Sequence, residues 1–205
     1  SASDPIGVQL FFDETTYRMM FDALDRVVRA KNNRLAYLRD LFYSHQPAQR
    51  FSFAPMRFPW LNATQEEAVN KVLQAKDVEV VHGPPGTGKT TTLVEAINEV
   101  LMRESQVLVC AQSNTAVDWI SEKLVDRGIS VLRIGNPTRV NDKMLGFTYE
   151  RLFEGHPDYP QLWAIRKAIR EVRADKGSRT SRHQKLERLK SRETELSIRI
   201  RNDIF

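Results

Sequence analysis

The sequence predicts an α/β fold in which a parallel sheet is flanked by a long N-terminal helix and a C-terminal helical hairpin. The main observation is a central stretch where short apolar segments alternate with segments of helical periodicity. The apolar segments span residues 78–82, 106–111 and 130–134, and the helical segments span residues 64–73, 89–102 and 115–127. Strands that alternate with helices of this length pair in parallel and are joined by right-handed crossovers.

Length and composition narrow the class of protein. The chain has 205 residues, of which 41% are hydrophobic and 28% are charged, enough for one domain with a core. No apolar run reaches the roughly 18 residues of a membrane span, and residues 1–4 carry no secretory signal. Cys110 is the only cysteine, which excludes an intrachain disulfide and a multi-cysteine metal site. We therefore expect a cytoplasmic protein with no membrane association, or a nuclear one in a eukaryote.

The N-terminal part predicts a strand, a long helix and a linker, in that order. Residues 6–12 are rich in β-branched and aromatic side chains, which indicates a short strand. Apolar residues then recur at helical spacing over residues 13–45, with an interruption at Asn32 and Asn33. Residues 46–60 contain three prolines and predict an extended linker.

The C-terminal part, residues 148–205, predicts two packed helices and carries the positive charge of the chain. The net charge is +5, yet residues 161–205 alone hold thirteen Lys or Arg against six Asp or Glu. Such a block favours a polyanionic partner, and it is equally typical of a solvated basic helix face. The sequence leaves both interpretations open.

A phosphate-binding loop is the strongest motif in the chain. The segment Gly83-Pro-Pro-Gly-Thr-Gly-Lys-Thr90 matches the pattern G-x4-G-K-[ST], and it lies between an apolar strand and a helix. Glycines at these positions allow several backbone N–H groups to face one phosphate, next to the positive end of the helix dipole. The residues predicted to bind the nucleotide here are Gly83, Pro84, Pro85, Gly86, Thr87, Gly88, Lys89, Thr90 and Thr91.

Two residues of the loop have chemical roles. Lys89 would bridge the β- and γ-phosphates, and the Thr90 hydroxyl would coordinate Mg²⁺. Hydrolysis also needs a carboxylate that holds Mg²⁺ and a base, usually an Asp-Glu pair that ends an apolar strand after the loop. No such strand follows residue 90, and Asp13 and Glu14, upstream, are more typical of a helix start. The catalytic carboxylates are therefore expected to be missing, and this chain alone is expected to be inactive.

Three segments occur in an order that resembles a known family. Residues 61–69, 82–92 and 107–118 resemble the Q motif, motif I and motif Ia of superfamily 1 helicases. The resemblance is to superfamily 1B, the type that includes the nonsense-mediated-decay helicase, senataxin and the immunoglobulin mu-binding helicase. Residues 133–140 resemble the arginine-glycine segment that follows motif Ia in that family.

This resemblance implies an organisation for the whole chain. It implies a P-loop NTPase (RecA-like) parallel sheet, incomplete here, as the first motor domain of a helicase. Its parts would be a barrel remnant (1–12), a stalk helix (13–45), a linker (46–60), a partial RecA-like core (61–147) and a helical insertion (148–205). The family's Asp-Glu motif and second RecA-like domain do not occur in the sequence. The resemblance therefore implies a fragment whose partner is the remainder of a helicase chain.

The resemblance also assigns roles to residues. Gln65 matches the glutamine that reads the adenine edge, which favours ATP, and its alternative role is to cap the helix after the linker. Ser113, Asn114 and Thr115 match the segment that contacts single-stranded DNA or RNA, although a helix cap explains the same residues. Gln112 departs from the proline usual in motif Ia.

The function expected from these observations is that of an ATP-dependent helicase motor domain that uses ATP, Mg²⁺ and a single strand. A catalytically silent nucleic-acid- or protein-binding module is the alternative. A chromosome-maintenance-type coiled-coil ATPase is less favoured, because it predicts a P-loop near the N-terminus and a much longer heptad run. The sequence does not distinguish DNA from RNA or indicate an oligomeric state.

Overall fold

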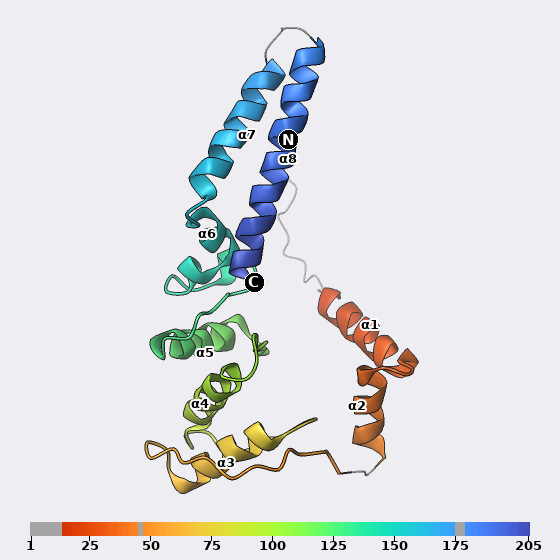
Figure 1. The fold of residues 1–205 in the computed structure, drawn as a ribbon. Helices are drawn as coiled ribbons and strands as arrows, with labels where there is room; N and C mark the ends of the chain where they lie inside the picture. Colours follow the sequence, from red (N-terminus) through yellow and green to blue (C-terminus); the bar gives the residue numbers. More distant parts are fainter. Residues whose placement is uncertain (1–13, 45–46, 175–178) are drawn as a thin grey trace, which may run out of the picture. The chain divides into compact units, whose positions relative to one another are not determined.

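The computed structural model describes residues 14–44, 47–174 and 179–205, so the strand predicted at 6–12 lies outside the described residues. The chain divides into two compact units, of which the first ends at Pro84 and the second begins at Pro85. Figure 1 labels the helices of the chain. Within the described ranges, no helix has both the length and the apolar character needed to cross a membrane.

The first unit contains the helices α1 (Thr15–Arg29), α2 (Arg34–Tyr43) and α3 (Ala63–Gln74). The interruption noted in the sequence separates α1 from α2: Asn32 has a left-handed backbone with φ of 54°, and Asn33 caps α2 by accepting from the Ala36 N–H at 2.9 Å. The guanidinium of Arg39 donates from Nη1 to three carbonyls at the end of α1, at 2.9–3.0 Å. Arg39 therefore donates to backbone carbonyls at the end of α1, where helical donors are no longer available to all of them.

The second unit contains α4 (Lys89–Leu101), α5 (Asn114–Asp126), α6 (Tyr149–Glu154), α7 (Tyr159–Ala174) and α8 (Arg179–Ile204), with two 3₁₀ turns at Pro137–Arg139 and Leu145–Phe147. The helices α4 and α5 pack through Ile97, Ile120 and Leu124, with half-buried valines of the segments 106–111 and 129–134 against them. This cluster packs together α4 and α5, the two helices whose first turns contain predicted binding residues.

The predicted parallel sheet is wrong. Among the residues that the structure describes there is no strand, and the β-bridges are two isolated ones, Arg50 with Ala75 and Arg133 with Thr148. A strand in a parallel sheet is covered on both faces, yet Val80, Leu108 and Ile134 are 76%, 81% and 65% exposed. The apolar pattern predicted strands, but a strand also requires a neighbour that exchanges backbone hydrogen bonds with it.

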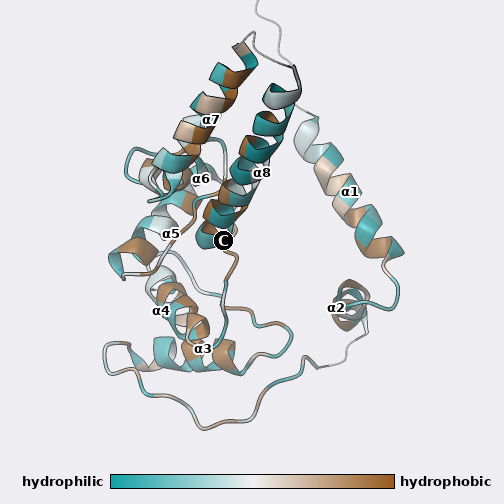
Figure 2. Cartoon of the chain, turned by 45° about the horizontal axis from the view of Figure 1, so that its top comes forward, coloured by the Kyte–Doolittle hydropathy of each residue, from teal (hydrophilic) through white to brown (hydrophobic). Residues whose placement is uncertain are grey.

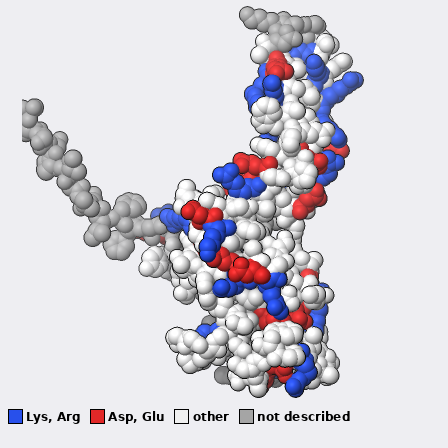
Figure 3. Space-filling view, turned by 90° about the vertical axis from the view of Figure 1, so that its left-hand side faces the viewer, with Lys and Arg blue, Asp and Glu red and all other residues white. Residues whose placement is uncertain are grey.

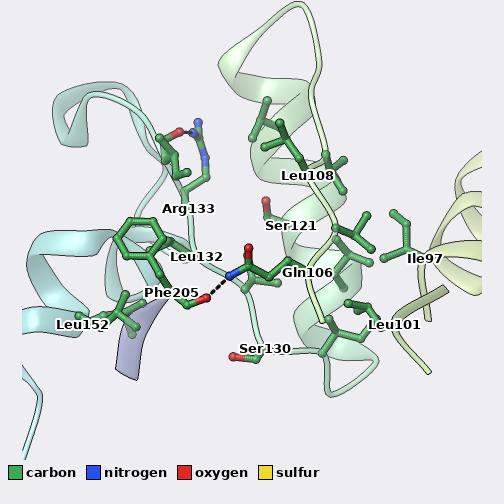
Figure 4. A pocket seen from close by; sticks show the side chains of 18 of the residues that line it. Ile97, Leu101, Gln106, Leu108, Ser121, Ser130, Leu132, Arg133, Leu152 and Phe205 are labelled. Carbon is green, nitrogen blue, oxygen red and sulfur yellow. Dashed lines mark hydrogen bonds between the residues drawn. The ribbon is translucent and has the colours of Figure 1, made fainter. Parts of the chain in front are cut away.

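An apolar pocket of about 400 Å³ lies where two of the predicted strands would pair. Residues 105–109 and 129–134 line it together with α4, α5, Leu152 and Phe205 (Figure 4). The side-chain amide of Gln106 donates to the carbonyl of Phe205 across this space. The two segments therefore line a pocket instead of forming a ladder.

The hairpin of α7 and α8 is held by a small core. Leu162, Leu196 and Ile200 are buried, and Phe153, Tyr159, Ile165 and Ile204 pack around them. Elsewhere α8 is polar, and it is drawn largely in teal in Figure 2. Glu193 breaks the apolar repeat of α8, and its carboxylate instead accepts from Nε of Arg166 on α7 at 2.8 Å. An ion pair therefore replaces an apolar contact at this level of the hairpin.

Candidate functional site

The phosphate-binding loop runs directly into α4. Gly86 and Gly88 have φ of 80° and 77°, a left-handed backbone that side-chain-bearing residues rarely adopt. Gly88 is the N-cap of α4 and offers no side chain to cap it, and no acidic residue lies in the first turn. A helix start with a glycine N-cap and no acidic residue in its first turn is suited to an anion, because the helix dipole is positive there.

The predicted reactive side chains lie on the first turn of α4. Lys89 and Thr90 are half-buried, and Thr91 is exposed. Thr92, which the sequence analysis did not single out, is buried, and its hydroxyl donates to the carbonyl of Gly88 at 3.2 Å. Thr92 thus ties the turn to the glycine before it, and the run of three threonines was the available signal.

These residues fit a nucleotide with a magnesium ion. The loop offers a lysine, a threonine hydroxyl and left-handed glycines. The first turn of α4 contains no acidic side chain that would repel a phosphate. Within the described residues, no cluster of three His, Cys, Asp or Glu side chains forms an independent metal site. The loop would supply the Thr90 hydroxyl to a magnesium ion, and the carboxylate that usually joins phosphate oxygens and water around this ion is not among the loop residues.

The second predicted segment begins α5. The Ser113 hydroxyl accepts from the Ala116 N–H at 3.1 Å, so Ser113 is the N-cap, the alternative that the sequence analysis had named. Asn114 and Thr115 are exposed on the first turn. The side-chain oxygen of Asn114 accepts a hydrogen bond from Nη2 of Arg133 at 3.2 Å.

A buried ion pair lies behind Asn114. Nε of Arg133 donates to Oδ1 of Asp118 at 2.6 Å, and the two side chains are 2% and 5% exposed. The other oxygen of Asp118 accepts from the Asn141 N–H at 2.9 Å. Neither residue was predicted from the sequence as a functional residue, although both lie within the segments that resemble helicase motifs.

The two units divide the predicted nucleotide site. The residues Pro85, Gly86, Thr87, Gly88, Lys89, Thr90 and Thr91 belong to the second unit, as do Ser113, Asn114 and Thr115. Gln65, Gly83 and Pro84 belong to the first. Gln65 forms a capping box: its Oε1 accepts from the Asn62 N–H at 3.1 Å, and Asn62 Oδ1 accepts from the Gln65 N–H at 2.9 Å. The structure therefore gives Gln65 a capping role, and its role toward adenine stays a prediction.

Comparison with known proteins places these segments in a family. The family model described as AAA domain matches residues 60–203. An uncharacterised ATP-dependent helicase of Methanocaldococcus jannaschii is 33% identical over 172 residues, which cover 82% of this chain and 26% of the relative. The DNA-binding protein SMUBP-2 of Mus musculus is 33% identical over 164 residues, which cover 78% of this chain and 16% of the relative.

A yeast relative extends this pattern. The ATP-dependent helicase NAM7 of Saccharomyces cerevisiae is 35% identical over 133 residues, which cover 61% of this chain and 14% of the relative. The chain thus matches about a quarter or less of the length of each of these relatives.

Proposed function

Because this chain belongs to the AAA domain family and to the superfamily 1 helicases, we propose that it is part of an ATP-dependent helicase motor. In this proposal it binds MgATP at the phosphate loop and a single nucleic-acid strand at the start of α5. The observation that carries the proposal is the loop itself, in which two left-handed glycines lead into the first turn of α4, a turn with no acidic residue.

Each residue of the loop has a defined task in this proposal. The backbone N–H groups of residues 86–90 would hold the β-phosphate, and the Lys89 ammonium would neutralise charge between the β- and γ-phosphates. The Thr90 hydroxyl would be a ligand of a magnesium ion, whose positive charge would offset the charge of the phosphates. Thr92 supports this geometry through its hydrogen bond to the Gly88 carbonyl.

The start of α5 supports the strand contact. Asn114 and Thr115 are exposed there and carry small polar side chains that can approach a phosphate closely. Because Ser113 already satisfies the Ala116 N–H, the strand would be held mainly by Asn114, Thr115 and the remaining N–H groups of the first turn.

The positive hairpin is a second surface for the strand. Within the described residues, Arg170, Arg173, Lys185 and Arg188 have no ion pair with a carboxylate, whereas Arg166, Lys190, Arg192 and Arg199 each have one. On the face drawn in Figure 3, basic and acidic side chains are interspersed along the hairpin. Part of the charge excess is thus neutralised locally, which makes the hairpin an auxiliary rather than a principal contact.

Binding and turnover measurements on this chain test the proposal. A fluorescent ATP analogue with Mg²⁺ should bind, and Lys89→Ala should weaken binding roughly tenfold or more because a charge-assisted contact is lost. Lys123→Ala, on the exposed face of α5, is the matched control and should leave binding unchanged. We expect ATP turnover no higher than that of Lys89→Ala, with or without a single strand, because no Asp-Glu strand follows the loop.

The results separate the candidate functions. Strand binding that ignores ATP and survives Lys89→Ala, without nucleotide binding, would favour a silent binding module over a motor part. Strand-stimulated turnover that Lys89→Ala abolishes would contradict the expected inactivity, and Asp13 and Glu14 would be the first carboxylates to replace. Absence of both nucleotide and strand binding would overturn the proposal.

A further inference from the structure

Arg133 is a buried charge whose hydrogen bonds are directed at particular acceptors. Its Nε donates to Asp118 at 2.6 Å, and its Nη1 donates to the carbonyl of Ile134. The backbone N–H of Arg133 donates to the Phe147 carbonyl at 2.8 Å. These contacts hold the guanidinium in one orientation, since a buried pair retains its position only where its partners are satisfied.

The same guanidinium reaches the exposed helix start. Nη2 of Arg133 donates to Oδ1 of Asn114 at 3.2 Å. Asn114 and Asp118 are four residues apart on α5 and therefore lie on the same face, so one planar guanidinium bridges them. The contact links a buried pair to a side chain at the surface.

This contact determines which way the amide of Asn114 faces. A guanidinium has only donors, so it can pair with the oxygen of the amide and not with its NH₂ group. With the oxygen held by Arg133, the NH₂ group of the exposed Asn114 is directed to the other side. Phosphate oxygens only accept, so this is the orientation that a nucleic-acid backbone requires.

We infer that Arg133 is a positioning residue that orients the Asn114 amide so that its NH₂ group donates to a phosphate of the bound strand. The inference rests on the proposed strand contact at the start of α5. Asp118 participates by anchoring the guanidinium from within the unit.

The test uses conservative variants of the 205-residue chain. Arg133→Lys keeps a positive charge beside Asp118, but a single ammonium cannot reproduce the fork that also reaches Asn114. Asn114→Ala removes the amide. Arg139→Lys, an exposed change of the same chemistry in the nearby 3₁₀ turn, is the matched control. Affinity for fluorescein-labelled oligodeoxythymidylate and oligouridylate, affinity for an ATP analogue, and melting temperature are measured for each.

We expect Asn114→Ala and Arg133→Lys each to lower strand affinity roughly tenfold. Asn114→Ala removes the NH₂ group that donates to the phosphate, and Arg133→Lys leaves that group without its orientation. The double variant should bind the strand no more weakly than Asn114→Ala alone, since the two residues act through one contact. Nucleotide affinity should be unchanged in all of them, and Arg139→Lys should bind the strand like the parent chain.

A further measurement needs no Arg133 variant, in case that variant does not fold. Addition of oligonucleotide should shift the side-chain NH₂ resonances of Asn114, identified by their loss in Asn114→Asp. An unchanged resonance would overturn the inference.

The failures are distinguishable. Strand affinity that Asn114→Ala leaves unchanged would overturn both the proposed strand contact and this inference. Affinity lowered by Asn114→Ala but not by Arg133→Lys would overturn the inference alone. Additive losses, accompanied by a fall in melting temperature and in nucleotide affinity, would show that Arg133 is merely structural.

Discussion

Asn70 pairs with both backbone groups of Met56, as a neighbouring strand would. Its Oδ1 accepts from the Met56 N–H at 2.7 Å, and its Nδ2 donates to the Met56 carbonyl at 2.9 Å. Nδ2 also donates to the carbonyl of Glu66 on the preceding turn of α3, at 2.9 Å. One buried amide thus attaches the proline-containing linker to a helix.

Replacing Asn70 with Ala should therefore destabilise the first unit. The change leaves the N–H and the carbonyl of Met56 without their partner, at a cost of about 1–3 kcal/mol. Chemical denaturation measures the loss. Lys71→Ala on the same helix, which removes only an exposed pair with Glu67, is the control and should change stability by less than about 1 kcal/mol. Equal effects of the two variants would contradict the role given to Asn70.

The stability of the first unit should depend on pH through Asp77. The backbone N–H of Gln49, followed by the side chains of Arg34 and Tyr37, lowers the pKa of the Asp77 carboxyl. The three donor–acceptor distances are 2.8–2.9 Å. A lowered pKa means that the carboxylate stabilises the fold above its unfolded pKa of about 3.9 and loses this effect as pH falls through the folded value.

Asp77→Asn should accordingly destabilise the chain at neutral pH, and its difference from the parent should shrink below about pH 4. Tyr37→Phe removes one donor and should lose part of the same stability in the same pH range. Melting temperatures recorded between neutral and acid pH provide the measurement. A difference for Asp77→Asn that grows on acidification would have the wrong sign for this mechanism.

Gln65 offers a way to separate capping from adenine recognition. Gln65→Glu retains an acceptor at the third position of α3, so the capping box with Asn62 should survive and stability should change little. A carboxylate has no N–H donor, however, so an adenine contact that needs one would be lost. We expect reduced affinity for an ATP analogue at unchanged melting temperature. Unaltered nucleotide affinity would leave Gln65 with its capping role alone.

The hairpin should lose stability when its core is truncated. Leu196 is 1% exposed and packs with Leu162 and Ile200, so Leu196→Ala should cost about 2–5 kcal/mol. Hydrogen exchange over α7 and α8 should report the loss locally. Ile198→Ala, two residues along the same helix and 49% exposed, is the control and should have little effect. Similar exchange in both variants would show that the core is not where the structure places it.

Local features of the fold could be predicted from the sequence because they depend on neighbouring residues. The helices expected at 64–73, 89–102 and 115–127 occur as α3, α4 and α5, within one residue at each end. Their starts follow from short-range chemistry, namely the capping box of Asn62 and Gln65, the glycine before Lys89 and the Ser113 cap. Periodicity and capping residues are properties of a few consecutive positions.

Whether the apolar segments form a sheet could not be predicted in this way, because strand pairing depends on which segments meet. The apolar segments around Val80, Leu108 and Ile134 have the composition of buried strands, yet they make no ladder with one another in the described residues. Strand pairing is a long-range property, and an apolar run alone does not specify its partner.

The sequence by itself determined the phosphate-loop motif, the helices around it and the family to which the chain belongs. Each of these depends on residues that are consecutive or nearly so in the sequence. Only the tertiary structure revealed the partners of Asn70, Asp77 and Arg133, whose hydrogen bonds join residues 14, 28 and 15 positions apart, respectively. Those contacts depend on where the chain places distant groups. A buried polar or charged side chain is stable only where other residues supply its hydrogen-bond partners. A local sequence pattern does not specify which distant residues those are.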